Sequence, residues 1–381
     1  MTGLLDLPPE LLIRIIEEMR SYWMYTAKER QTDLARIAQV HPITHAVAHS
    51  MLYGGDVTAR SAGRTHLLAR TLLDNQLIPS LIRTLSFKSE MDSGHVESLI
   101  TILRNVPHLE SLTLGAVYFK DPPSDLYTAI QTHTQLRSFS YGFYSAESPF
   151  EKIVPLLNSF PNLKHLALDR VAPLQFSGPL LPPSKRGMGW WGPPPTYSLE
   201  SISISDWRMI GSSGWPLEVL SWLFGSTKSS LRSFQIDFLG LTSLESIFEF
   251  LVDRSCTLAL ERLTIRDFQD LSTLEPIPLD PNSLASTFPN LTHLFLMTNA
   301  DESSFLTPTP HLLIPPNLQT LQVDDDLFLT WRLLEAVQAD SVPTSFKRLR
   351  LRGPFPSDPD VKALKRVCEA KGIVCEALRP F

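Results

Sequence analysis

Residues 187–192, Gly-Met-Gly-Trp-Trp-Gly, match in letters the glycine pattern that binds the phosphates of a dinucleotide. That chemistry needs a strand before the glycines and a helix after them, so that backbone amides at the helix start face the phosphates. Prolines occupy positions 182–183 and 193–195 instead. We therefore predict no nucleotide site in this segment.

Three histidines, His41, His45 and His49, recur every four residues, which is a spacing that zinc ligands use on one helix face. No cysteine or carboxylate follows nearby, and Pro42 directly follows His41. Cys368 and Cys375 are expected to be small core residues. No nucleophile elbow, P-loop or paired-carboxylate motif is found. The sequence therefore predicts a protein that is not an enzyme and that binds no metal and no cofactor.

Arginines that share one strand face are the remaining candidates for recognition chemistry. Arg262 and Arg266 form one set, and Arg348, Arg350 and Arg352 form another. Guanidinium groups bind carboxylates and phosphates in a fork, so these residues could pair with acidic or phosphorylated groups of a partner. Alternating arginines also keep an open sheet edge soluble and unpaired. Both explanations stay open.

A repeated pattern predicts the elements that position these arginines. The form apolar-x-x-apolar-x-apolar begins at Ile82, Leu109, Leu136, Leu163, Leu199, Leu231, Leu260, Leu291, Leu318 and Phe346. The steps are 27, 27, 27, 36, 32, 29, 31, 27 and 28 residues. Alternation over the last three apolar slots predicts a strand, and the remaining residues of each step suffice for a helix and two turns.

This pattern is typical of a leucine-rich repeat, so the predicted fold class is α/β: a solenoid with a parallel β-sheet on its concave side and helices on its convex side. About ten repeats should fill residues 81–381, followed by a degenerate C-terminal cap with a helix at 358–371 and a strand at 373–378. Only one repeat has Asn eight residues after its first apolar residue, at Asn299. We therefore expect the turns to be held mainly by apolar packing.

The concave face is the expected binding surface. Ten strands span about 45 Å, which is enough for a protein partner. The longest step holds a loop insertion at 177–196, rich in Pro and Gly, whose two tryptophans either pack back on the body or contact a partner. The candidate substrate-binding residues on the face or loop are His165, Asp169, Asp237, Arg262, Arg266, Phe295, Arg348, Arg350, Arg352, Trp190 and Trp191.

Composition limits the classes of partner. The net charge of -6 provides no overall basic field for nucleic acid or an anionic membrane, so neither partner is predicted. Three cysteines cannot form a disulfide framework and suit a reducing compartment. No secretory signal and no run of eighteen apolar residues is found. We expect a soluble protein in the cytoplasm, the nucleus or both.

The N-terminus predicts a separate helical module at 1–55. Asp6 can cap a helix, and Pro8 and Pro9 fall where a first helical turn has no hydrogen bond to lose. Apolar residues then recur on one side of the helix. Further helices are expected at 33–39 and about 43–52. Residues 56–80 are expected to form a linker helix that caps the first repeat.

This module resembles an F-box over roughly residues 4–52. The resemblance rests on Leu7-Pro8-Pro9-Glu10-Leu11-Leu12, then Ile15-Ile16, then Asp33-Leu34, Ile37 and Val40. It implies docking onto a Skp-family adaptor, and through it onto a cullin scaffold, while the repeats bind a protein substrate. By position, the adaptor-binding residues would be Leu7, Pro8, Leu11, Leu12, Ile15 and Ile16.

The function predicted from these parts is that of a substrate-receptor subunit of a cullin-RING (SCF-type) ubiquitin ligase. The alternative is a leucine-rich-repeat scaffold that binds proteins without a ubiquitin-ligase role. In that case the N-terminal apolar residues only pack on the next two helices and form a cap.

Overall fold

The structure is a computed structural model that describes residues 8, 11, 14–15, 18, 36, 39, 48–49, 51–87, 93–117, 123–143, 153–169, 193–205, 217–240, 244–268, 287–297, 317–324, 333–334, 337–338, 342–352 and 359–378. The chain divides into two compact units, Met1–Ser145 and Ala146–Phe381. Each unit is described by itself.

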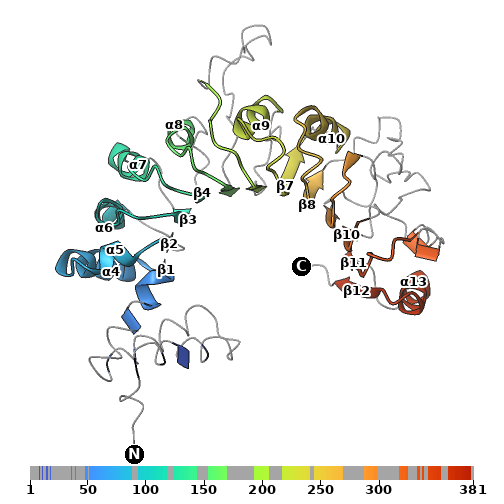
Figure 1. Ribbon diagram of the computed structural model, residues 1–381, viewed down its shortest axis with the longest axis horizontal. Coiled ribbons are helices and arrows are strands. Elements are labelled where there is room, and N and C mark those ends of the chain that lie inside the picture. The colour runs from blue at the N-terminus through green and yellow to red at the C-terminus, as the bar shows by residue number, and fades with distance from the viewer. Residues whose placement is uncertain are drawn as a thin grey trace, which may run out of the picture. The chain divides into compact units, whose positions relative to one another are not determined.

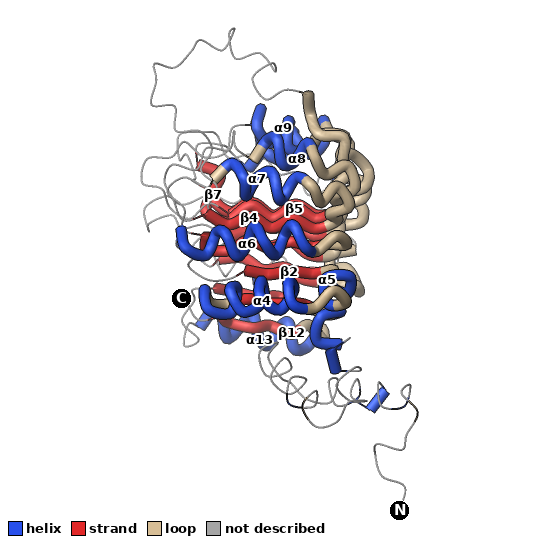
Figure 2. Tube along the Cα trace, turned by 90° about the vertical axis from the view of Figure 1, so that its left-hand side faces the viewer, coloured by secondary structure: helices blue, strands red, loops and turns tan. Residues whose placement is uncertain are grey.

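The first unit contains a parallel sheet whose strands follow chain order (Figure 1). The strands are β1 (Asp56–Ala59), β2 (Thr84–Phe87), β3 (Ser111–Val117) and β4 (Ser138–Phe143). The helices between them are α4 (Ala62–Asp74), α5 (Ile78–Leu81), α6 (Ser93–Asn105) and α7 (Ser124–Gln131). α6 lies beside both α4 and α7 on one face of the sheet (Figure 2).

The second unit repeats this arrangement. Its parallel strands, also in chain order, are β5 (His165–Asp169), β6 (Ser201–Ser205), β7 (Ser233–Gly240), β8 (Arg262–Phe268), β9 (His293–Met297), β10 (Thr320–Asp324), β11 (Arg348–Arg352) and β12 (Val374–Leu378). Helices α8 (Val154–Asn158), α9 (Leu217–Phe224), α10 (Leu244–Asp253) and α13 (Pro359–Ala370) cover one face (Figure 1). Each unit is thus mixed α/β and compatible with a solenoid-like repeat fold.

The apolar pattern explains why these strands form. Every one of the ten predicted strands begins two residues after the first apolar residue of its repeat, as β5 does after Leu163. The apolar side chains of the pattern that the structure describes are at most 3% exposed. Full burial of one such side chain stabilises the fold by about 1.5–3 kcal/mol, so the shared period also carries much of the stability.

The helices bury the other side of each repeat. In α6, Val96, Leu99 and Leu103 recur at helical spacing and are at most 4% exposed. At the C-terminus, α13 and β12 confirm the expected helix at 358–371 and strand at 373–378. β12 pairs in parallel with β11, so β11 is an interior strand of its sheet.

Residues 56–59 correct one prediction. They form the strand β1, which pairs with β2, and the expected linker helix is only the later part of 56–80. Val57 and Ala59 are buried while Asp56 and Thr58 face outward, as in the other strands. The repeat pattern missed this strand because Gly54 occupies its first apolar slot. Ser61 then caps α4, accepting a hydrogen bond from the Arg64 amide.

Several predictions lie outside the described residues. In the N-terminal module, Leu11, Arg14, Ile15 and Glu18 are helical, and the Leu11 amide donates to the Pro8 carbonyl at 2.9 Å. The packing of the three predicted helices falls outside the described part of the chain. The same holds for Trp190 and Trp191 and for His41 and His45.

Candidate functional site

The second unit has a sheet face that its helices do not cover, which we call the open face. Along β5, the side chains of His165, Ala167 and Asp169 lie on it, while Leu166 and Leu168 are buried on the helix side. Strand register aligns such positions into rows. The first row is His165, Ser201, Ser233, Arg262, His293, Thr320, Arg348 and Val374.

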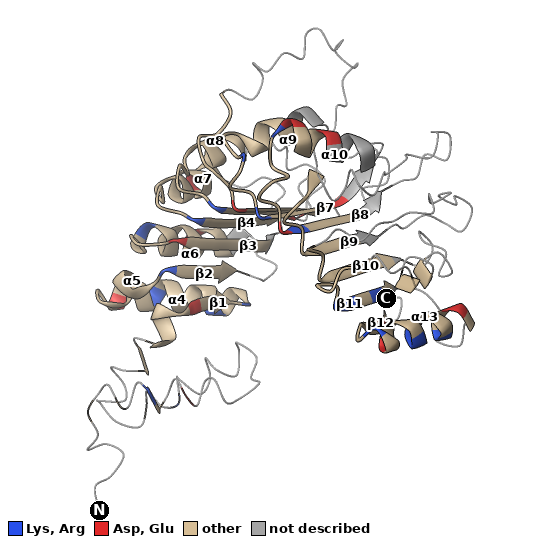
Figure 3. Cartoon of the chain, turned by 45° about the vertical axis from the view of Figure 1, so that its right-hand side comes forward, with Lys and Arg blue, Asp and Glu red and all other residues tan. Residues whose placement is uncertain are grey.

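The second row of the open face lies two residues further along each strand. It consists of Ala167, Ser203, Gln235, Thr264, Phe295, Gln322, Arg350 and Glu376. Eight parallel strands give the face a width of about 34 Å across the strands. The charged residues of these strands are coloured in Figure 3.

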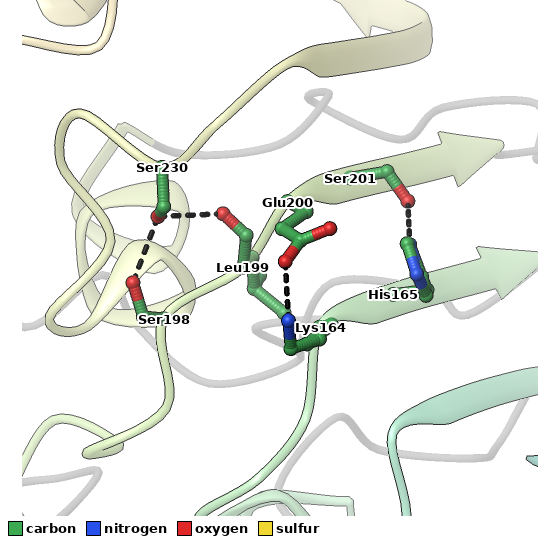
Figure 4. Close-up of polar contacts among 7 residues, drawn as sticks. All are labelled: Lys164, His165, Ser198, Leu199, Glu200, Ser201 and Ser230. Carbon is green, nitrogen blue, oxygen red and sulfur yellow. Dashed lines mark hydrogen bonds and ion pairs between the residues drawn. The ribbon is translucent and has the colours of Figure 1, made fainter. Parts of the chain in front are cut away.

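The half of the open face on β5–β7 carries hydroxyl and acidic groups that are bonded to one another. His165 Nδ1 and Ser201 Oγ are 2.9 Å apart (Figure 4), and Ser205 donates to Asp169 Oδ1 at 2.7 Å. Gln235 Nε2 lies 3.4 Å from Asp237 Oδ1. These bonds fix the side chains in place before any partner binds.

The half of the open face on β8–β12 is basic. Arg350 donates through Nε to Glu376 Oε2 at 2.7 Å, while Arg348 Nε lies 3.9 Å from Glu376 Oε1. Arg262 is exposed, and among the described residues it makes no ion pair. The carboxylate of Glu376 therefore lies beside two guanidinium groups, and it binds that of Arg350 closely.

His293 lies between the arginines of the first row. Its Nδ1 is 2.8 Å from Thr292 Oγ1, and its ring stacks on Phe295 with centroids 6.3 Å apart. Burial and the positive charges of Arg262 and Arg348 lower the pKa of His293 below its ordinary value, and Glu261 opposes the shift. The lowered pKa favours the neutral form of the His293 imidazole.

Opposite charges alternate along the edge at which the strands begin. Lys164 Nζ donates to Glu200 Oε1 at 2.5 Å (Figure 4), and Arg232 pairs with Glu261 at 2.7 Å. The hydrogen bond from Lys164 lowers the pKa of Glu200. In the first unit Arg83 pairs with Glu110 at 3.8 Å. These exposed pairs align neighbouring repeats, and each contributes little stability.

Polar side chains at the turns add hydrogen bonds to the apolar packing that was expected to hold them. The residue just before each repeat often bonds a carbonyl of the preceding turn. Asn290 donates to Leu258 O at 2.7 Å, and Asn317 and Gln135 bond Pro289 O and Pro107 O in the same way. An amide at this position replaces the Asn that was sought eight residues into the repeat.

The open face of the first unit is rich in small hydroxyl groups. Register aligns Thr84, Ser111 and Ser138 in one row and Ser86, Thr113 and Ser140 in the next. It carries no arginine or lysine among these strand positions. The charged candidates for recognition therefore belong to the second unit.

The structure brings most predicted substrate-binding residues onto one face. The side chains of His165, Asp169, Asp237, Arg262, Phe295, Arg348 and Arg350 all belong to the open face of the second unit. Arg266 and Arg352 lie on β8 and β11, but their side chains are outside the described part. Of the adaptor-binding candidates, Pro8 and Leu11 are exposed and Ile15 is half-buried, while Leu7, Leu12 and Ile16 are not described.

Three residues were missed as site residues: Glu376, His293 and Thr320. Glu376 lies in the predicted last strand, two residues after Val374, so the register opposite Arg350 could have indicated it. Thr320 lies between His293 and Arg348 in the first row and is 6% exposed.

Comparisons with known proteins identify no family. No family model and no curated protein matches the chain. Among solved structures, the chain is similar to a crystal structure of a protein from Bacteroides fragilis, with 14% identity over 83% of this chain and 81% of the other, and a TM-score of 0.38. Similarity at this level carries no argument about fold or function.

Two searches of the described residues concern other classes of site. No group of three or more His, Cys, Asp or Glu side chains there is arranged to hold a metal ion. None of the described helices is long and apolar enough to cross a membrane.

Proposed function

We propose that this chain is a leucine-rich-repeat substrate receptor of an SCF-type ubiquitin ligase and not an enzyme. Its F-box-like N-terminal helices bind a Skp-family adaptor, and through it a cullin scaffold. Its open face binds a protein substrate. The observation that best supports protein binding is the open face of the second unit, where exposed Arg262, Arg348 and His165 stand on a buried, hydrogen-bonded sheet.

The dimensions and the chemistry of that face favour a protein over a small ligand. A surface about 34 Å across is in the range of protein interfaces. Its polar side chains are held by bonds such as that from Ser205 to Asp169, so few rotamers need to be ordered on binding. The adaptor part of the proposal rests on the resemblance of residues 4–52 to an F-box.

Co-expression with a Skp-family adaptor followed by size-exclusion chromatography tests the adaptor part. We expect the full chain to co-elute with the adaptor and the Leu11→Asp/Ile15→Asp variant not to, because carboxylates would have to be buried in an apolar contact. The matched control is Val252→Asp/Leu258→Asp, which makes the same kind of change at exposed apolar residues of the second unit.

Separate elution of the unmutated chain and the adaptor would reject the ligase role. The protein would then be a leucine-rich-repeat scaffold whose N-terminal helices form a cap. Leu11 is 44% exposed, so its side chain can pack against a partner or against another part of the chain.

A further inference from the structure

The first row of the open face places two arginines around two uncharged polar residues. Strand register sets Arg262 opposite His293, His293 opposite Thr320, and Thr320 opposite Arg348. Three strand spacings separate the two arginine backbones by about 14 Å. Both arginines act on the pKa of His293, which lies between them. The side chains of Arg262 and Arg348 can therefore both reach one bound group.

The positive charge of Arg262 and Arg348 is only partly neutralised within the described part of the chain. Glu261 precedes Arg262 but pairs with Arg232 at 2.7 Å. Glu376 binds Arg350 at 2.7 Å, and its other oxygen is 3.9 Å from Arg348. Arg348 is 46% exposed there, so its guanidinium has donors left for a ligand.

Protection of a sheet edge does not explain these arginines. β8 pairs with β7 and β9, and β11 pairs with β10 and β12. Charged side chains that block edge pairing belong on edge strands. Arg262 and Arg348 lie on interior strands and point away from the helices, so the alternative weighed from the sequence is removed for both.

The residues between the arginines suit an oxyanion. Thr320 carries a hydroxyl group that can donate a hydrogen bond, and His293 is a neutral imidazole that gains a proton more readily when negative charge arrives. Phe295, stacked on His293, forms an apolar wall in the second row. The guanidinium groups can donate hydrogen bonds to phosphate or carboxylate oxygens, and the His293 ring can donate one through Nε2 once it is protonated.

We infer that Arg262 and Arg348, which flank His293 and Thr320 in the first row, bind one anionic side chain of the protein partner. The group is either a carboxylate or a phosphoryl group, since both present oxyanions to a guanidinium fork. The inference deepens the proposed function, because it rests on a protein binding the open face.

Fluorescence anisotropy on the full chain tests the inference with three labelled Gly-Ser peptides of one length. Their central residue is phosphoserine, glutamate or serine. We expect one or both anionic peptides to bind more tightly than the serine peptide. Arg262→Gln and Arg348→Gln should each weaken that binding about tenfold, as loss of a charged hydrogen bond does. Tighter binding of the phosphoserine peptide than of the glutamate peptide would indicate a phosphorylated partner. Equally tight binding of these two peptides would indicate that a carboxylate suffices.

Glu376→Gln offers a test in the opposite direction. Removal of this carboxylate frees Arg348 and Arg350 from their only described acidic partner, so the anionic peptides should bind several-fold more tightly. The matched control is Lys362→Gln/Arg366→Gln on exposed positions of α13, which removes two positive charges without touching the open face. It should leave peptide binding unchanged.

The inference is overturned if the serine peptide binds as tightly as both anionic peptides, or if Arg262→Gln/Arg348→Gln binds them as the unmutated chain does. A dissociation constant weaker than about 1 mM for every peptide would overturn it as well. None of these results bears on co-elution with the adaptor. Failure of this site and failure of the ligase role are therefore distinguishable.

Discussion

His293 links the charge of the open face to pH. Its pKa is lowered by burial and by Arg262 and Arg348. We expect Arg262→Gln/Arg348→Gln to move this pKa up toward the ordinary value, because two of its causes are removed. NMR titration of the imidazole resonances measures it. Lys362→Gln/Arg366→Gln should leave the His293 titration unchanged.

The same shift sets the sign of a stability effect. The folded-state pKa of His293 lies below its value in the unfolded chain, which is about 6.5. The unfolded chain therefore binds the proton more tightly. The contribution of His293 to stability is present above pH of about 6.5 and is lost as pH falls through the folded pKa. A His293 pKa at or above 6.5 in the unmutated chain would contradict this account.

A buried hydroxyl group at Thr227 holds the turn before β6. Thr227 is 1% exposed, and its Oγ1 accepts a hydrogen bond from the Leu199 amide at 2.9 Å. Thr227→Val keeps the shape and leaves that amide unsatisfied, so we expect a loss of about 1–3 kcal/mol in the free energy of unfolding. Urea unfolding followed by circular dichroism measures the loss.

Thr264→Val is the matched control for this change. Thr264 lies half-buried on the open face, where water can reach its neighbours. It should change the free energy of unfolding by no more than about 0.5 kcal/mol. Equal effects of the two substitutions would show that the Leu199 amide does not depend on Thr227.

At the scale of elements, α13 and β12 close the C-terminal end of the second unit. Val361, Leu364 and Cys368 of α13 are fully buried at helical spacing. Leu364→Ala removes core volume and should cost about 2–5 kcal/mol in the free energy of unfolding. Lys362→Ala, at an exposed position of the same helix, should be nearly neutral in the same urea titration. A Leu364→Ala variant as stable as Lys362→Ala would show that α13 does not belong to the core.

Most elements could be predicted because each repeat contains the apolar pattern that predicts its own strand. Burial of the three apolar residues of each pattern, as at Leu163, Leu166 and Leu168, depends only on their local spacing. β1 escaped because Gly54 stands where an apolar residue was required. The apolar pattern thus predicted ten strands, and the single residue Gly54 was enough to prevent the prediction of β1.

The candidate site was harder to predict, because its chemistry depends on contacts between repeats. Arg350 and Glu376 are brought together by the pairing of β11 with β12. Glu261 forms its ion pair with Arg232 and not with Arg262, its neighbour in the sequence. Such choices depend on side-chain reach across neighbouring strands. The sequence predicted which arginines share a face. The structure shows that Glu376 contacts Arg348 and Arg350, whereas Arg262 makes no ion pair among the described residues.

At the scale of the whole molecule, stability should propagate from repeat to repeat. Within the second unit each strand pairs only with its sequence neighbours. Phe234→Ala empties a fully buried site beside Phe224, whose ring centroid is 5.5 Å away. We expect hydrogen exchange to show lost amide protection in β6, β7 and β8 before β11 and β12.

Mass spectrometry of peptides from each strand resolves this gradient. The conservative Phe234→Leu variant should show the same order with a smaller loss, because it leaves a smaller cavity. Uniform loss of protection from β5 to β12 would mean that the unit unfolds as one cooperative block and would contradict nearest-neighbour coupling.

The strand starts share one forked bond that does not depend on the length of the repeat. Lys164 O accepts from the amides of Glu200 and Ser201 at 2.7 and 3.0 Å across the 36-residue step. Glu110 O accepts from Arg137 and Ser138 at 2.8 and 3.1 Å across a 27-residue step. The connections between strands can therefore vary in length and sequence while the strands, and the side chains of the open face, keep the same spacing.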